Sequence, residues 1–266
     1  MEDTLKGQVT HSAADIYEAF FVPALFERWA PLVAEEARIE PGQRVLDVAC
    51  GTGVLAREAA RRAGRASLVT GLDRNEGMLA VARRQAPEID WQAGAAEALP
   101  FADQSFDAVV SQFGLMFFDD RTTALREMGR VLRPDGRLAV AVWDRLENSP
   151  GYAAMVVLLQ RLFGERVADQ LRAPFALGDP DALAALANQA GIADVDIETS
   201  TRPTRFPSLE AWVRTDVKGW TLADLIDDAQ LAVLQREAAK DLAPFVQADG
   251  TVAFPSPAHI MRAAKR

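Results

Sequence analysis

Cysteine, histidine and basic residues are scarce in this chain of 266 residues. One cysteine, Cys50, excludes an intramolecular disulfide, and with only two histidines beside it the sequence predicts no metal site. The 29 basic side chains are outnumbered by 38 acidic ones, which gives a net charge of −9. Because binding to nucleic acid depends on neutralising phosphates with positive charge, we expect no nucleic-acid partner.

Long apolar runs are missing as well. The longest, residues 153–159, is too short to cross a bilayer. The chain begins Met1-Glu2-Asp3 and shows no basic region followed by an apolar stretch, so no signal peptide is expected. The rest is ordinary globular composition, with 49% hydrophobic and 25% charged residues. These features predict a cytoplasmic protein without a membrane span, and they leave its oligomeric state open.

Short apolar runs alternate with helical patterns over residues 41–145. Residues 44–49, 66–72, 89–92, 106–111 and 137–143 have strand patterns, and helical periodicity fills much of the sequence between them. This rhythm is typical of a doubly wound, Rossmann-like α/β sheet. With two later candidate strands at 195–201 and 258–263, we expect about seven strands, mostly parallel, in a single domain over residues 1–266.

Helical segments flank this core. Residues 1–40 show helical spacing of apolar side chains, and residues 148–178 and 203–255 are largely helical additions after the fifth strand. Ligands of such sheets bind outside the carboxyl ends of the strands. We therefore expect the three segments to form a cover over that edge.

A glycine loop follows the first strand. Residues 51–56 fit the pattern G-x-G-x-x-G/A between a strand and a helix, where glycines allow a tight turn and helix amides face a ligand. Asp73 lies 20 residues after Gly53, at the end of the next strand, and is placed to accept hydrogen bonds from ribose hydroxyls. The pattern predicts a ligand that contains adenosine.

NAD(P) and S-adenosylmethionine both satisfy this geometry. Asp47, four residues before Gly51, favours a ligand with an ammonium and a sulfonium, because a carboxylate there would repel a pyrophosphate. Neither tyrosine has a lysine four positions on, so the dyad of short-chain dehydrogenases is missing. An NAD(P)-dependent oxidoreductase and a non-catalytic, cofactor-binding regulator on the same fold stay open as alternatives.

Residues 45–53, VLDVACGTG, resemble the signature motif of class I S-adenosylmethionine-dependent methyltransferases. Residues 69–73, 96–101, 105–110 and 125–134 add to this similarity, which covers about residues 40–145. It is closest to the branch that contains the ubiquinone/menaquinone C-methyltransferases and many small-molecule methyltransferases. The resemblance implies transfer of a methyl group from S-adenosylmethionine to a small-molecule acceptor, by in-line displacement without a metal.

The resemblance also implies roles for single residues. Those implied in cofactor binding are Asp47, Ala49, Gly51 and Gly53 for the methionine part, Asp73, Arg74 and Met78 for the ribose and adenosine, Ala95 and Ala96 for the adenine edge, and Ser111 and Gln112 beside the methyl group. Tyr17 would donate its hydroxyl to the cofactor carboxylate or else pack in the core. Ala95 departs from the family pattern, because Asp is common there, and this leaves the adenine amino group without its usual acceptor.

The remaining candidates concern the acceptor and the chemistry. His11 is a weak candidate for a base, and no arrangement resembles a dedicated one, so we expect catalysis by proximity and desolvation. Cys50 is interpreted as a packing residue of the loop. Aromatic residues after the fourth strand and in the late insertion would suit an apolar or aromatic acceptor. They are Phe113, Phe117, Phe118, Phe206, Trp212 and Trp220.

Overall fold

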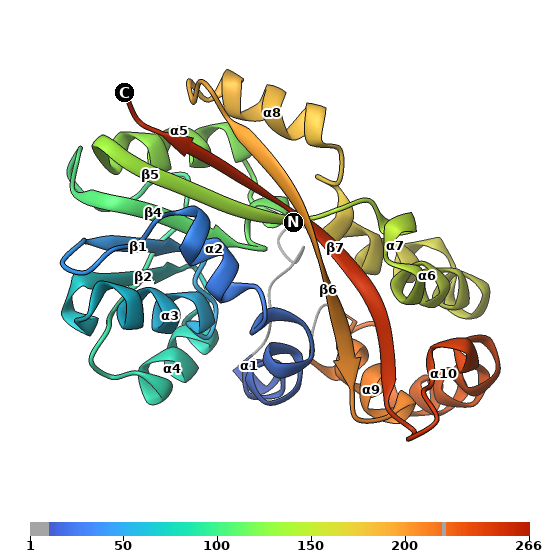
Figure 1. Cartoon of the computed structure of the whole chain (residues 1–266). Coiled ribbons are helices and arrows are strands. Elements are labelled where there is room, and N and C mark those ends of the chain that lie inside the picture. The colour runs from blue at the N-terminus through green and yellow to red at the C-terminus, as the bar shows by residue number, and fades with distance from the viewer. Residues whose placement is uncertain (1–10, 220–221) are drawn as a thin grey trace.

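The computed structural model describes residues 11–219 and 222–266, with the backbone alone for residues 11–13 (Figure 1). Within these ranges seven strands form one sheet in the order β3-β2-β1-β4-β5-β7-β6. The strands are β1 (Val45–Val48), β2 (Val69–Asp73), β3 (Asp90–Ala93), β4 (Phe106–Gln112), β5 (Leu132–Trp143), β6 (Asp196–Phe206) and β7 (Val252–Ala264). The α-helices are α1 (His11–Ile16), α2 (Ala30–Glu36), α3 (Val54–Ala63), α4 (Glu76–Gln85), α5 (Arg121–Val131), α6 (Pro150–Phe163), α7 (Glu165–Arg172), α8 (Pro180–Gln189), α9 (Leu209–Lys218) and α10 (Asp228–Asp241).

Strands β1 to β5 run parallel, whereas β7 runs antiparallel to both β5 and β6. The central strands β1 and β4 are buried almost throughout. They are buried because helices cover both faces of the sheet: α2 and α3 pack together on one face, and α5 and α8 on the other (Figure 1). The doubly wound, mostly parallel sheet of about seven strands that the sequence predicts is confirmed.

The last two strands are longer than the sequence pattern indicates. β6 continues to Phe206 and β7 begins at Val252, so both ends of the 203–255 segment, expected to be largely helical, are strand. Pairing with β5 stops at Ala258, which lies opposite Trp143. Beyond that point residues 201–206 and 252–257 pair with each other and form a two-stranded arm that leaves the sheet (Figure 1).

Aromatic side chains hold helices around this arm. The Trp212 ring on α9 lies 4.8 Å from that of Phe254 on β7, and Tyr152 on α6 lies 5.3 Å from the same ring. Phe206 stacks against Trp212 at 6.1 Å. Phe206 and Trp212, which the sequence offered as acceptor contacts, therefore belong to the hydrophobic core of the arm. The third aromatic residue offered there, Trp220, lies outside the described residues.

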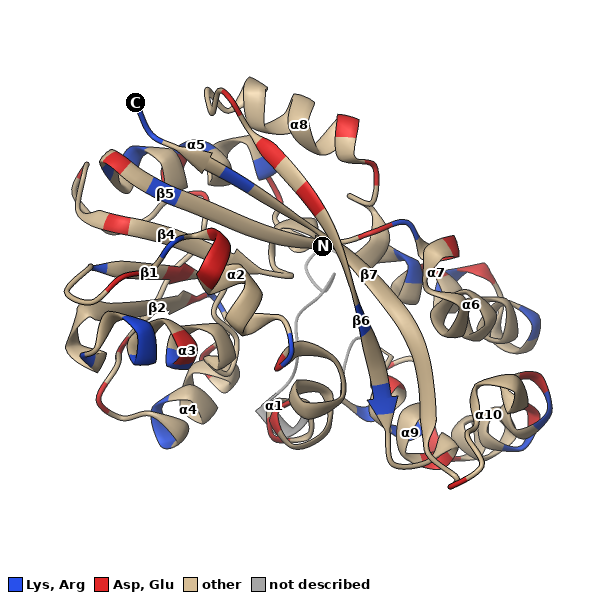
Figure 2. Ribbon diagram, viewed as in Figure 1, with Lys and Arg blue, Asp and Glu red and all other residues tan. Residues whose placement is uncertain are grey.

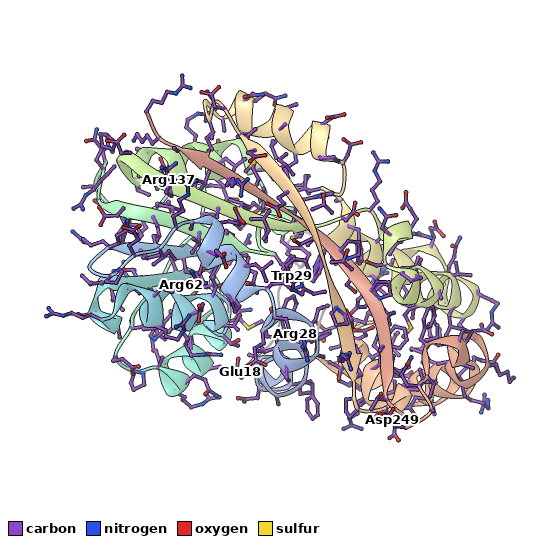
Figure 3. The ribbon with its side chains drawn as sticks, in the orientation of Figure 1. Glu18, Arg28, Trp29, Arg62, Arg137 and Asp249 are labelled. Atoms are coloured by element: carbon purple, nitrogen blue, oxygen red, sulfur yellow. The ribbon has the colours of Figure 1, made fainter. Side chains whose placement is uncertain are left out.

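The N-terminal segment lies over the carboxyl edge of the sheet. It continues from α1 into a π-helix, η1 (Tyr17–Phe26), and Trp29 is fully buried between this segment and the sheet (Figure 3). Glu18 forms an ion pair with Arg57 on α3, with 3.0 Å between Oε1 and Nη2. Arg57 also donates to the carbonyl of Thr52 in the glycine loop at 2.8 Å. These contacts fasten the segment to the loop that follows β1.

Three buried polar groups on the helices α6 and α9 beside the arm have no hydrogen-bond partner among the described residues. They are both carboxylate oxygens of Asp216, the Tyr152 hydroxyl and the indole N–H of Trp212. Burial raises the pKa of Asp216 well above its usual value, although the nearby indole of Trp212 opposes this shift. Because the carboxyl group is buried without a hydrogen bond of normal geometry, its charged form has a high free energy.

We expect Asp216→Asn to flatten the pH dependence of stability. The pKa of Asp216 is higher in the folded protein than in the unfolded chain. Between these two pKa values the folded protein keeps the proton and the unfolded chain loses it, so the free energy of unfolding falls as pH rises through this range. Asparagine stays neutral, so the variant should gain about 1–3 kcal/mol over the wild type at pH 8. Urea unfolding between pH 5 and 8 measures this. Asp228→Asn is the control, because Lys218 lowers the pKa of that exposed acid; equal slopes for Asp216→Asn and the wild type would contradict the prediction.

Candidate active site

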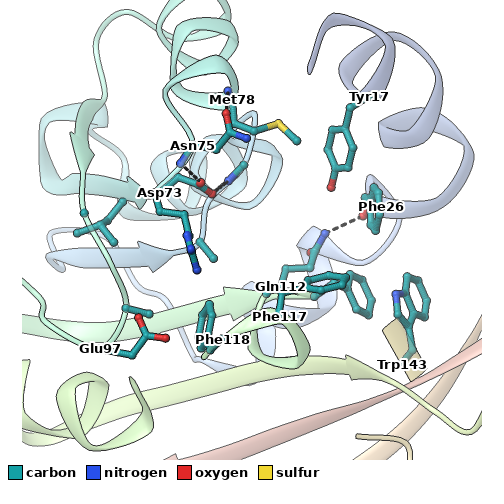
Figure 4. A pocket seen from close by; sticks show the side chains of 18 residues that line it. Tyr17, Phe26, Asp73, Asn75, Met78, Glu97, Gln112, Phe117, Phe118 and Trp143 are labelled. Carbon is teal, nitrogen blue, oxygen red and sulfur yellow. Dashed lines mark hydrogen bonds between the residues drawn. The ribbon is translucent and has the colours of Figure 1, made fainter. Parts of the chain in front are cut away.

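A pocket lies at the carboxyl ends of β1, β2, β4 and β5, beneath the N-terminal segment (Figure 4). Its empty volume is about 910 Å³, including space open to solvent. Eight of the residues predicted to bind the cofactor line it: Tyr17, Ala49, Gly51, Asp73, Arg74, Met78, Ala96 and Gln112. Three of the aromatic residues predicted to contact the acceptor also line it: Phe113, Phe117 and Phe118. Its other lining residues are Phe26, Leu72, Asn75, Gly94, Glu97, Gly114 and Trp143.

The loop after β1 is tightly wound. Ala49, Gly51 and Gly53 all adopt positive φ, at 58°, 56° and 88°. Such a conformation is costly for alanine, and strained backbone of this kind concentrates at functional sites. The turn closes with a hydrogen bond of 2.8 Å from the N–H of Gly53 to the carbonyl of Cys50. Gly53 then caps α3, so the start of that helix faces the loop.

Gly53 packs closely against a side chain of β3, and its expected place at the methionine part of the cofactor stays a prediction. It does not line the pocket. A Cβ atom at Gly53 would lie 2.4 Å from the ring of Trp91, and one at Gly71 on β2 would lie 2.3 Å from the same ring. Trp91 on β3 thus fills the space beneath the loop, and its indole N–H donates to the carbonyl of Ala86. Only glycine leaves room for it.

Asp73 connects the two loops that border the pocket. One carboxylate oxygen accepts the N–H of Gly51 and the other accepts the N–H of Asn75, each at 2.8 Å. Burial raises the pKa of Asp73, while these backbone hydrogen bonds act to lower it. Asn75 caps α4 by accepting the N–H of Gly77 at 2.9 Å. Asn75 was not among the predicted site residues, although an asparagine just before a helical pattern is an N-cap signal.

Asp47 and Ser111 are buried and do not line the pocket, and the expected place of Ser111 beside the methyl group stays a prediction. Asp47 is 1% exposed, and its Oδ2 has no partner among the described residues. Burial and the nearby Asp73 raise the pKa of Asp47, against a backbone hydrogen bond from Ala56. Ser111 is fully buried, and its hydroxyl also has no described partner. A buried carboxylate with one unpartnered oxygen behind a binding loop suits a cationic ligand, because a positive charge would offset its burial.

The adenine side of the pocket differs from the expected one. Ala95 is exposed and does not line the pocket, whereas Ala96 does. Glu97 also lines it, and its Oε1 accepts the N–H of Asp119 at 3.0 Å. The pocket therefore has an acid two residues beyond the position where the family pattern has its aspartate. Glu97 lies within the motif AEALPF, so the sequence contained it but gave no reason to single it out.

Aromatic rings wall the other end of the pocket. Phe113, at φ 57°, stacks on Trp143 with 3.7 Å between the ring centroids, and the ring of Phe26 lies 5.7 Å from that of Phe113. Tyr17 stacks on Phe26 at 5.1 Å, and burial with the charge of Asp73 raises the pKa of Tyr17. Gln112 donates through Nε2 to the carbonyl of Phe26, and its Oε1 is buried without a described partner.

Three other sequence expectations concern residues away from this wall. The side chain of His11 lies outside the described part of the structure. Cys50 is buried and its pKa is raised well above the usual value, which agrees with a packing role because the reactive thiolate is disfavoured. No lining residue of the pocket comes from residues 148–178 or 203–255. The part of the cover that reaches the pocket comes from the N-terminal segment, and a closing role of the late insertions stays a prediction.

The described residues show neither a metal-binding cluster nor a membrane-spanning helix. They contain no group of three or more His, Cys, Asp or Glu side chains arranged to hold a metal ion. Within the same ranges no helix is long and apolar enough to span a membrane.

The fold and the position of the pocket agree with the known proteins that this chain resembles. Residues 46–140 match the family described as "Methyltransferase domain". The chain also resembles the Haemonchus contortus phosphoethanolamine N-methyltransferase 2 solved with phosphomonomethylethanolamine and S-adenosylhomocysteine, with a TM-score of 0.63, 20% identity and coverage of 96% of this chain and 57% of that one. At this identity the likeness concerns the fold.

Closer sequence similarity is found to quinone methyltransferases. The chain is 51% identical over 123 residues to the demethylmenaquinone methyltransferase of Renibacterium salmoninarum, covering 46% of this chain and 51% of the relative. It is 37% identical over 155 residues to a ubiquinone/menaquinone biosynthesis C-methyltransferase of Bordetella avium, covering 55% of this chain and 60% of the relative. The chain thus spans a little over half the length of these relatives. The resemblance found in the sequence is confirmed, since residues 46–140 match a methyltransferase domain and the relatives are methyltransferases.

Proposed function

We propose that this protein transfers a methyl group from S-adenosylmethionine to a small-molecule acceptor with an apolar or aromatic portion. The observation that carries the proposal is the pocket itself. It joins a strained glycine loop and the buried acid Asp73 at one end to a wall of aromatic rings at the other. The matched family and the quinone methyltransferases among the relatives support the same reaction.

The residues present fit this cofactor. The glycine loop and Asp73 would hold the ribose and the methionine part, and the unpartnered oxygen of Asp47 provides negative charge behind the loop for a cationic ligand. Glu97 would accept the adenine amino group in place of an acid at Ala95. S-adenosylmethionine supplies a methyl group already activated by the sulfonium charge.

The protein's own contribution is to position the acceptor and exclude water. Tyr17 lines the pocket, and its raised pKa keeps the hydroxyl protonated at neutral pH, so it donates a hydrogen bond and does not serve as a base. Phe26, Phe113 and Trp143 would hold an apolar acceptor against the methyl group in a poorly hydrated space. Alignment of donor and acceptor can supply several orders of magnitude in rate.

Titration calorimetry tests this proposal with three ligands, S-adenosylmethionine, S-adenosylhomocysteine and NADH. We expect the first two to bind with micromolar affinity or better and NADH to give no heat of binding, because the carboxylate of Asp47 behind the glycine loop would repel a pyrophosphate. Formation of S-adenosylhomocysteine with a panel of hydroquinones and phenols then measures turnover. Tighter binding of NADH would favour the oxidoreductase, and binding without turnover on any acceptor would favour the regulator.

A further inference from the structure

A second cleft adjoins the candidate active site. It lies between η3 (Leu115–Phe117) with the start of α5 on one side and α7 with η5 (Ala173–Phe175) on the other. The two spaces share Arg74, Phe117 and Phe118 as lining residues. The cleft has an empty volume of about 1930 Å³, including space open to solvent. An elongated ligand can therefore occupy the pocket and extend into the cleft.

The cleft is positively charged in a chain that is acidic as a whole. Four arginines line it, against two aspartates, whereas the complete chain has a net charge of −9. Two of these arginines are paired: Arg74 with Asp119 at 3.1 Å, and Arg172 with Asp169 at 2.7 Å. Figure 2 shows acidic and basic residues side by side on α7. These ion pairs neutralise both aspartates, so two arginines of the cleft keep an unpaired positive charge.

These two arginines, Arg121 and Arg166, have no acidic partner among the described residues. Arg166 is exposed on α7 and takes part in no described hydrogen bond or ion pair. Arg121 is half-buried at the start of α5, where its Nη2 donates to the carbonyl of Met116 at 2.8 Å. The Nε of Arg121 is buried without a described partner, and burial lowers the pKa of this guanidinium.

A half-buried guanidinium without a carboxylate is unusual, because its desolvation is normally offset by an anion. Its planar N–H groups match the two oxygens of a carboxylate or a phosphate. We propose that this cleft binds an anionic group, carboxylate or phosphate, of the methyl acceptor, with Arg121 as the main contact and Arg166 as the second. The apolar part of the acceptor lies over Phe117 and Phe118 and reaches the pocket. This inference rests on the proposed function, because it takes the occupant of the cleft to be the methyl acceptor.

Small aromatic probes test the cleft without knowledge of the acceptor. Benzoate and phenyl phosphate carry the two anionic groups, and benzyl alcohol is the neutral counterpart. Ligand-detected NMR titrations of the full chain saturated with S-adenosylhomocysteine give the affinities. We expect Arg121→Met to weaken binding of the anionic probes by about tenfold to 100-fold and that of benzyl alcohol by less than twofold. Arg166→Met should show the same selectivity with a smaller loss, because its side chain is exposed.

Arg126→Met is the matched control, since Arg126 lies on the same helix, is exposed and does not line the cleft. Arg121→Lys tests the fork geometry and should recover only part of the affinity. Thermal unfolding verifies that each variant is folded. Preference for benzoate or for phenyl phosphate identifies the anionic group, and either result supports the proposal. Equal binding of the anionic probes by Arg121→Met, Arg126→Met and the wild type would overturn it.

The outcome also separates this inference from the proposed function. If the wild-type protein binds S-adenosylhomocysteine but Arg121→Met leaves the affinity for the anionic probes unchanged, the cleft proposal fails and the methyltransferase proposal stands. If the probes depend on Arg121 but the protein binds neither cofactor form, the cleft binds anions and the proposed function fails. In that case the role of the bound anion as methyl acceptor fails as well.

Discussion

The variant Asp73→Ala is expected to bind S-adenosylmethionine about 10- to 150-fold more weakly than the wild type. The carboxylate of Asp73 is the acid at the end of β2, and it is held in place by the N–H groups of Gly51 and Asn75. Charge-assisted hydrogen bonds from ribose hydroxyls to such a group contribute about 1.5–3 kcal/mol, which corresponds to this range of affinities. Titration calorimetry with S-adenosylmethionine or S-adenosylhomocysteine measures the loss.

A ligand lacking a ribose hydroxyl separates direct contact from distortion of the loop. If Asp73 binds the ribose, a 2′- or 3′-deoxy form of S-adenosylhomocysteine should bind the wild type more weakly, and Asp73→Ala should no longer distinguish it from the parent ligand. Asp90→Ala is the control for lost charge, because this exposed acid on β3 does not line the pocket. Wild-type affinity in Asp73→Ala, or additive losses with the deoxy ligand, would contradict the ribose contact.

The second large effect is expected for Gly53→Ala, which should lower the free energy of unfolding by about 2–5 kcal/mol. A side chain at the positive φ of Gly53 costs about 1–2 kcal/mol. Its Cβ would also lie 2.4 Å from the ring of Trp91, and forcing an extra carbon into a packed core costs about 1–3 kcal/mol more. Urea unfolding of the ligand-free protein measures the difference.

Gly51→Ala provides a matched control two residues away. Gly51 also has a positive φ, but a Cβ there would meet no atom within 4 Å, so only the backbone cost of about 1–2 kcal/mol applies. In a Trp91→Leu background the cost of Gly53→Ala should fall by at least about 1 kcal/mol, because the obstructing ring is gone. Equal losses for the two glycine variants, or no coupling to Trp91, would show that packing beneath the loop does not explain Gly53.

The alternation of strands and helices determined the sheet and the position of its binding edge. Gly51 and Asp73 could be located from sequence alone because a glycine loop between a strand and a helix, with an acid at the end of the next strand, is a local pattern. Parallel strands then bring both residues to the same edge of the sheet. The structure places both in the pocket, and their roles toward the cofactor await the tests above.

Other parts of the site depend on contacts that no local pattern records. Phe26 and Trp143 are separated by more than a hundred residues, and they face the same pocket only because the N-terminal segment folds over the end of β5. Gly53 matched the loop pattern as well as Gly51 did, but the ring of Trp91, on β3, packs against Gly53 and leaves no room for a side chain there. The motif therefore identified the loop that borders the pocket, but it did not show which residues of the loop line the pocket and which pack behind it.

The sequence by itself thus determined the fold class, the methyltransferase motifs and the glycine loop with its acid, because these follow from local periodicity and spacing. Only the tertiary structure decided which residues surround the ligand and which carry uncompensated charge. The unpaired state of Arg121 is the clearest case: its charge can be read from the sequence, but the absence of an acidic partner among the described residues depends on the tertiary structure. Pairing of charges is a property of distances across the fold, and sequence spacing does not contain those distances.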